Sequence, residues 1–244
     1  MDAYVRDWQA WSPTCPSKAD WITAVGGQTE AAVADSPSPA AFPAMLRRRL
    51  GGLHRHAVDT VGRLADLNKA IFVVGSRHGD YGRTVRLLES LADDDEVSPA
   101  DFSLSVHNAL AGLLSIAMKN RQSHVSIAAG PDTFNAVFME SFGLLYRHPG
   151  TPVVVICCDE PLPASYTSMI DLDESDPVVL AVLLQGSKPA NGDDAVALNV
   201  EVVSGTGASE NMETQIGSFI RLMCAEESAE TRSRDLALAW SRHV

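Results

Sequence analysis

Three short, uninterrupted apolar runs constrain the fold of this chain more than any other feature. They span residues 70–75, 125–129 and 151–156. Their brevity and their β-branched residues are typical of strands buried on both faces. Helical segments lie between them, near residues 84–91 and after Pro131, since proline suits the first turn of a helix. This alternation predicts a layered α/β domain, with a mixed sheet and helices on both faces.

Further elements are expected on either side of these strands. Residues 1–43 predict a short strand followed by a proline-rich loop, and residues 44–66 predict one amphipathic helix. Two apolar runs, 178–185 and 195–203, flank Asn191-Gly192 and predict an antiparallel hairpin. We therefore expect residues 44–203 to form the main body of the domain. Residues 204–244 are expected to form a C-terminal helical extension, with a helix at 212–226 and a helical tail.

Composition excludes several classes of protein. The chain has 244 residues and a net charge of −12, which argues against a partner that is a nucleic acid. It contains no run near the roughly 20 apolar residues needed to span a membrane, and its first residues lack the apolar core of a signal peptide. Its cysteines show no metal-ligand spacing. We expect a cytoplasmic protein with reduced thiols, no metal site and no cofactor.

Residues 106–118 predict a helix that is apolar on nearly every side. Such a helix belongs in a large core or in a subunit interface. Gly112 costs about 1 kcal/mol relative to alanine inside a helix, so we interpret it as a point of close helix packing. His107 and Asn108 form the best polar pair in this region. We interpret them as buried, hydrogen-bonded residues rather than as an acid–base pair.

Five short motifs stand out along the chain. They are Ser-Arg-His-Gly at 76–79, Val-Ser-Pro at 97–99, Ser-Leu-Ser-Val-His-Asn-Ala at 103–109, Ala-Gly-Pro-Asp-Thr-Phe at 129–134 and Asp-Glu-Pro-Leu-Pro at 159–163. These motifs resemble those of the β-ketoacyl synthase family, whose members have the thiolase-like fold. The resemblance covers most of residues 45–203 and implies the N-terminal half of that fold. It is closest to the short ketosynthase-like, or chain-length-factor, subunits of aryl polyene (xanthomonadin-type) pigment clusters.

One departure from the family pattern concerns the reaction itself. Condensing enzymes use a cysteine at a helix N-terminus, where the helix dipole stabilises the thiolate. An ungapped alignment from Ser98 places Pro131 at that position. The family's catalytic histidines also have no counterpart, because His243 is the one histidine after residue 203. The resemblance therefore implies a chain that keeps the fold and has no catalytic residues.

The resemblance implies a non-catalytic subunit that forms a heterodimer with a full-length β-ketoacyl synthase and shapes its acyl tunnel. Acyl carrier protein would be reached indirectly, and the chain alone would form a homodimer at most. Asp101 and Phe102 are the candidates for limiting the acyl chain. The residues expected at the interface or tunnel are Asp101, Phe102, Ser105, His107, Asn108, Gly112 and Phe134.

Two alternatives stay open at the level of the sequence. The first is an acyl-transfer or hydrolytic enzyme that uses His107 or a cysteine outside the family pattern (Cys157, Cys158 or Cys224). The second is a scaffold that binds an acidic carrier protein through Arg47, Arg48 and Arg49. A solvated helix face is the simpler interpretation of these three arginines.

Overall fold

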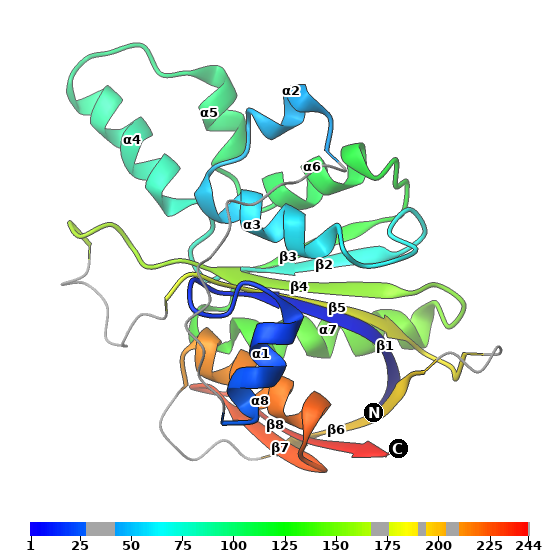
Figure 1. Ribbon diagram of the computed structural model, residues 1–244. Helices are drawn as coiled ribbons and strands as arrows, with labels where there is room; N and C mark the ends of the chain where they lie inside the picture. Colours follow the sequence, from blue (N-terminus) through cyan, green and yellow to red (C-terminus); the bar gives the residue numbers. More distant parts are fainter. Residues whose placement is uncertain (28–41, 167–175, 190–193, 204–209, 244) are drawn as a thin grey trace.

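A mixed, eight-stranded sheet runs through the molecule. The computed structural model describes residues 1–27, 42–166, 176–189, 194–203 and 210–243 (Figure 1). The strands lie in the order β3 (His124–Ile127), β2 (Ile71–Gly75), β4 (Val153–Asp159), β5 (Val178–Gln185), β1 (Asp2–Trp11), β6 (Val196–Val203), β8 (Ala237–His243) and β7 (Ser228–Arg232). Pairing is parallel from β3 through β2 to β4 and antiparallel from β4 to β7.

Helices cover both faces of the sheet, as the sequence predicted (Figure 1). The upper layer holds α2 (Ala44–Arg47), α3 (Gly52–Val61), α4 (Tyr81–Ala92), α5 (Pro99–Leu104) and α6 (Ala109–Ala117). The lower layer holds α1 (Lys18–Val25), α7 (Thr133–Arg147) and α8 (Met212–Cys224). The sheet curves so that β6, β8 and β7 wrap beneath α7 and α8 (Figure 1). None of the helices described is both long and apolar enough to cross a membrane.

The apolar runs at 70–75 and 151–156 are explained by burial from two sides. The prediction of a buried strand at 125–129 was wrong, because this run forms the edge strand β3, whose residues are exposed or half-buried. Every residue of β4 is buried, because helices lie above and below this strand. Val153, Val155 and Cys157 face the lower core, which also holds α7 and α8. Val154, Ile156 and Cys158 face the upper core with α3 and α6. The sequence of β4 therefore shows no alternation of polar and apolar residues, since neither face of this strand is exposed to water.

The single helix predicted over residues 44–66 was wrong. The chain forms α2, then a turn, then α3, and the break falls at Gly51, whose backbone is extended (φ −71°, ψ 179°). A Cβ at residue 51 would lie 2.6 Å from Oδ2 of Asp80. The glycine therefore allows the carboxylate before α4 to approach the backbone closely, which the apolar spacing of this segment does not reveal.

The predicted hairpin between residues 178–185 and 195–203 was also wrong. Both strands exist, but β1 lies between them and pairs antiparallel with each. The turn expected at Asn191-Gly192 lies outside the described residues, as does most of the loop expected at 36–43. The turn residues predicted that β5 and β6 pair with each other, whereas each of them pairs with the N-terminal strand β1.

The C-terminal tail is not helical as predicted. Helix α8 was expected, but the residues after it form β7 and β8, and β8 pairs with β6 over seven residues. Ala237, Leu238 and Trp240 are buried in this strand, with Trp240 on the lower core. Burial of these side chains outweighs the helix propensity of alanine and leucine. The C-terminal residues thus belong to the same sheet as the rest of the chain.

Candidate functional site

The candidate nucleophile position lies where β3 leads into α7. Residues Gly130–Asp132 form a 3₁₀ turn, which Gly130 enters with φ +57°. Pro131 is half-buried in this turn, and α7 begins two residues later, as predicted. Thr133 closes the turn, because its hydroxyl accepts the backbone N–H of Ala129 at 3.0 Å and donates to the carbonyl of Gly130 at 2.7 Å. Pro131 itself offers neither a thiol nor a hydroxyl.

The carboxylate next to Pro131 binds the turn between β7 and β8. Oδ1 of Asp132 accepts the hydroxyl of Ser233 and the backbone N–H groups of Asp235 and Leu236, the latter two at 3.0 and 3.1 Å. Residues 233–236 are called the C-terminal turn below. This contact joins segments about a hundred residues apart, so sequence reasoning did not anticipate it.

Asn135 also binds the hairpin that β7 and β8 form. Its side chain is fully buried, and its amide nitrogen donates to the carbonyls of Thr231 and Leu236 at 3.1 and 2.8 Å. Its carbonyl accepts the Thr231 hydroxyl at 2.7 Å, and that hydroxyl accepts the indole N–H of Trp240 at 2.8 Å. The polar side chains that follow Pro131 are therefore engaged by the chain itself.

Phe134 is part of the lower core and not of an interface. It is fully buried, with ring centroids 5.0 Å from Phe138 and 6.5 Å from Trp240. Its ring is therefore not exposed for contact with a partner, and its place at the acyl tunnel stays a prediction. Its position on the inner side of α7 follows from the aromatic residues of α8 and β8, which the sequence gives no means of placing.

A buried carboxylate organises the turn between β2 and α4. Asp159 ends β4, and it accepts the Ser76 hydroxyl at 2.9 Å and the backbone N–H of Arg77 at 2.9 Å. Ser76 in turn accepts the N–H of Gly79 at 2.7 Å. Burial raises the pKa of Asp159 to about 7, and these hydrogen bonds oppose that shift. The two motifs at 76–79 and 159–163 are therefore one structural unit.

Two histidines meet beside this turn. The ring of His107 lies about 3.4 Å from where a Cβ on Gly79 would be, and Gly79 has φ +66°. Burial, with the neighbouring charges of Arg77 and His107, lowers the pKa of His78 to about 4. His107 and Asn108 are exposed, which contradicts their interpretation as buried residues. They lie in the link between α5 and α6, just outside the region that the upper core covers.

The other residues expected at an interface lie along α5 and α6. Asp101 is half-exposed and forms an ion pair with the buried Arg83, while Phe102 is 64% exposed. Ser105 ends α5, and its hydroxyl donates to the carbonyl of Phe102 at 2.9 Å. A Cβ on Gly112 would meet nothing within 4 Å, so this glycine does not mark close helix packing. Sequence reasoning missed Arg83.

The arginines proposed to bind a carrier protein are at the surface. Arg47 ends α2, and Arg48 and Arg49 continue into the turn that follows. All three are exposed. The carbonyl of Arg49 accepts a hydrogen bond from Arg83 at 3.1 Å, which ties this turn to α4.

The cysteines lie in surroundings that disfavour a thiolate. Cys157 and Cys158 are buried in β4, and burial raises the pKa of both thiols well above the usual value. Partial burial raises the pKa of Cys224 as well. Over the described ranges of the chain, no group of three or more His, Cys, Asp or Glu residues is placed to hold a metal ion.

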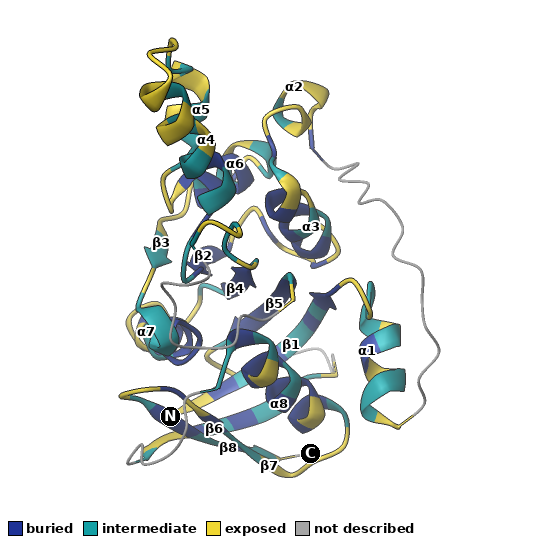
Figure 2. Ribbon diagram, turned by 90° about the vertical axis from the view of Figure 1, so that its left-hand side faces the viewer, coloured by how far each residue is buried: buried dark blue, intermediate teal, exposed yellow. Residues whose placement is uncertain are grey.

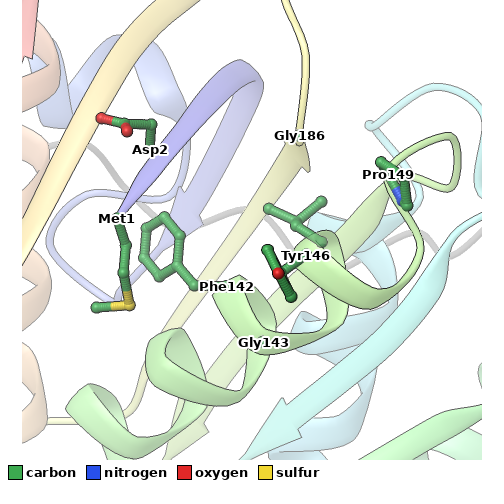
Figure 3. Close-up of a pocket in the computed structure, with 8 residues that line it drawn as sticks. Met1, Asp2, Phe142, Gly143, Tyr146, Pro149 and Gly186 are labelled. Atoms are coloured by element: carbon green, nitrogen blue, oxygen red, sulfur yellow. The ribbon is translucent and has the colours of Figure 1, made fainter.

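A cavity of about 670 Å³ lies at the far end of α7 from Pro131 (Figure 3). Its lining includes Met1, Phe142, Tyr146 and Gly186. Helix α7 has 15 residues, which corresponds to about 22 Å of length. The cavity is therefore remote from the candidate nucleophile position.

The comparison with protein families identifies this architecture. A model of the β-ketoacyl synthase N-terminal domain matches residues 19–241. The chain belongs to the β-ketoacyl synthase family. A search of the curated proteins finds no match.

Solved structures of β-ketoacyl synthases share the fold. The ketosynthase ApeO in complex with its chain length factor ApeC from Xenorhabdus doucetiae matches with a TM-score of 0.81 and 26% identity, over 99% of this chain and 100% of the matched chain. The ishigamide ketosynthase/chain length factor gives 0.64 and 15% identity, over 84% and 68%. A β-ketoacyl synthase from Burkholderia phymatum STM815 gives 0.63 and 12%, over 91% and 70%. The predicted thiolase-like fold is confirmed.

Proposed function

We propose that this chain is a non-catalytic, chain-length-factor-like subunit that pairs with a full-length β-ketoacyl synthase in aryl polyene-type chain elongation. The observation that carries the proposal is Pro131 at the start of α7. Around it, Asp132 and Asn135 form hydrogen bonds with the C-terminal turn and its hairpin. The similarity to a ketosynthase and chain length factor complex, over nearly the whole chain, supports the same role.

The upper side of the molecule supports a partner interface. Strand β3 lies at one edge of the sheet, and its residues are exposed or half-buried. Helix α6 contacts β3 and α5. Figure 2 shows α4 and α5 as largely exposed, on the same side as β3. Large apolar side chains that are exposed there are Leu88, Leu91, Phe102, Val106 and Ile116. Exposed apolar surface next to an open strand edge is typical of an obligate interface.

Phe102 is the residue that we propose to limit the acyl chain. It is large, apolar and 64% exposed, and it stands on a six-residue helix beside the proposed interface. An aromatic ring in this place would fill part of a tunnel formed with the partner. Replacement by alanine would lengthen the products that the complex releases, and the measurement is mass spectrometry of those products.

The proposal is tested by co-expression with the β-ketoacyl synthase partner. We expect the two chains to elute together in size-exclusion chromatography in equal amounts. After incubation with an acyl thioester, intact-mass analysis is expected to find the acyl group on the partner alone. Separate elution of the two chains would contradict the pairing. An adduct on Cys157, Cys158 or Cys224 would contradict the non-catalytic role.

The exposed arginines favour a further contact within this function. Carrier proteins are acidic, and Arg47, Arg48 and Arg49 are all exposed at the end of α2. We propose that they contribute to binding the carrier protein that serves the complex. Reversal of all three charges would weaken carrier binding to the heterodimer without separating its subunits. Unchanged binding would assign these arginines to solvated surface alone.

A further inference from the structure

Arg83 is a buried cation at the root of α4. Its side chain is 7% exposed, and Nε donates to Oδ2 of Asp80 at 3.0 Å. Nη2 donates to the carbonyl of Arg49 at 3.1 Å, and Nη1 donates to Asp101. These partners belong to three segments: the N-cap of α4, the turn before α3, and α5. A guanidinium presents its donors in a rigid planar fork, so the three contacts fix one another's geometry, whereas the three donors of an ammonium group rotate freely.

Helix α5 has few contacts with the core, and one of its other contacts is the ion pair with Arg83. It has six residues, and none of them is buried. Ser98 caps the helix by accepting the N–H of Asp101 at 3.2 Å, and Leu104 packs against the upper core from its other end. The ion pair with Arg83 therefore fixes the side of α5 that faces α4.

The same ion pair sets the direction of Phe102. Neighbouring residues of a helix lie about 100° apart around its axis. When Asp101 is held toward Arg83, the ring of Phe102 turns away from α4, and it is 64% exposed. Rotation of α5 about its axis would bring the ring to another face, and Arg83 opposes that rotation.

We infer that Arg83 is a positioning residue: by holding Asp101, it fixes α5 and aims the Phe102 ring at the partner. The role of Phe102 at the partner rests on the proposed function, whereas the positioning of its ring through Arg83 and Asp101 does not. Arg83 touches no substrate in this role. Its effect passes through Asp101 to the next residue of α5.

The first test reports on the ring alone. The full chain carries 4-(trifluoromethyl)phenylalanine at position 102, and its fluorine NMR spectrum is recorded with and without the partner. We expect Arg83→Gln to broaden or split the fluorine signal. Arg86→Gln is the matched control, because Arg86 is an exposed arginine on the same helix. Should Arg83→Gln fail to fold, Asp101→Ala removes the same contact and leaves the guanidinium its two other partners. A signal that neither variant alters overturns the inference.

The second test reports on function in the heterodimer. Arg83→Gln is introduced both into the native chain and into Phe102→Ala, and the ratio of long to short products is measured. We expect a shift of about two- to tenfold in the native chain, as is usual for residues coupled in one network. The shift is expected to vanish in Phe102→Ala. A shift of equal size in both backgrounds overturns the inference.

The two tests also separate this inference from the proposed function. Phe102→Ala can leave the product lengths unchanged while Arg83→Gln still alters the fluorine signal. That result rejects the tunnel role of Phe102 and supports Arg83 as its positioning residue. An unaltered fluorine signal together with longer products from Phe102→Ala supports the tunnel role and rejects Arg83 as the positioning residue.

Discussion

The lower layer buries its large apolar side chains, whereas α4 and α5 leave several of theirs exposed. Below the sheet, Phe134, Phe138, Phe219 and Trp240 form an aromatic cluster in which no ring is more than 1% exposed. Above it, α5 buries no residue, and the one residue that α4 buries is the cation Arg83. The aromatic cluster is therefore buried within the chain itself, whereas α4 and α5 expose apolar surface to solvent.

This difference bears on what each region does. A condensing enzyme needs room for an acyl group where α7 begins, but here Asp132 and Asn135 bind the C-terminal turn and its hairpin at that place. A subunit that docks on a partner needs apolar surface outside, and α4 to α6 supply it. The chain thus stabilises its own fold around Pro131, and it exposes part of its apolar surface at the proposed interface.

The largest effect on stability is expected in the aromatic cluster. Trp240→Ala removes a buried ring that contacts three phenylalanines and leaves a cavity. It should lower the free energy of unfolding by about 3–5 kcal/mol. Tyr146→Ala is the control, because Tyr146 is 89% exposed and its loss should change stability by less than about 0.5 kcal/mol. Urea denaturation measures both, and equal effects would show that the buried aromatic cluster contributes no more to stability than an exposed ring.

A smaller loss is expected when Asn135 no longer binds the hairpin of β7 and β8. Asn135→Ala leaves the Thr231 hydroxyl and the carbonyls of Thr231 and Leu236 without this partner, which should cost about 2–3 kcal/mol. Asn199→Ala is the matched control, since Asn199 bonds Asp2 at the surface. Denaturation of both variants, with hydrogen exchange of β7 and β8, measures the difference. If Asn135→Ala leaves the hydrogen-exchange protection of β7 and β8 unchanged, Asn135 does not stabilise this hairpin.

Local sequence signals were sufficient for strands β2 and β4 and for the start of α7, but they wrongly predicted that the edge strand β3 is buried. The runs in β2 and β4 are buried on both faces, so their composition alone indicates strands. Pro131 begins its helical segment because proline fixes the backbone angle that a first turn needs. Each of these features depends on residues close in sequence.

Long-range contacts determine what the sequence did not reveal. The turn signal between β5 and β6 predicted that these two strands pair with each other, but β1 lies between them. The residues of β5 and β6 do not indicate that β1 is their neighbour. Phe134 was assigned to an interface because its motif resembles the family's active-site segment, but Trp240 and Phe138 enclose it. Arg83 was missed for the same reason, since its partners come from three separate segments.

The exposed apolar surface gives the next prediction, which concerns affinity rather than stability. Ile116 is 65% exposed on α6, so Ile116→Asp should change the unfolding free energy by less than about 0.5 kcal/mol. At a buried position of the heterodimer, it should weaken binding by about thirtyfold, or about 2 kcal/mol. Ile22→Asp on α1 is the matched control, because Ile22 is exposed on the opposite layer. Titration calorimetry decides between them, and equal affinities would place the interface elsewhere.

The last prediction concerns the pH dependence of the turn that leads into α4. Burial raises the pKa of Asp159 from 3.8 to about 7, so the folded chain retains a proton that the unfolded chain loses between these values. The folded state then binds more protons, and stability must fall as pH rises from about 4 to 7, by at most about 1.4 kcal/mol per pH unit. The contribution is complete below pH 4, and above pH 7 both states are ionised and the slope ends. Asp159→Asn should remove this part of the slope while the pH dependence from other groups persists. Urea unfolding at intervals from pH 4 to 8 measures it, and identical slopes for the two proteins would show that Asp159 is already ionised in the folded chain.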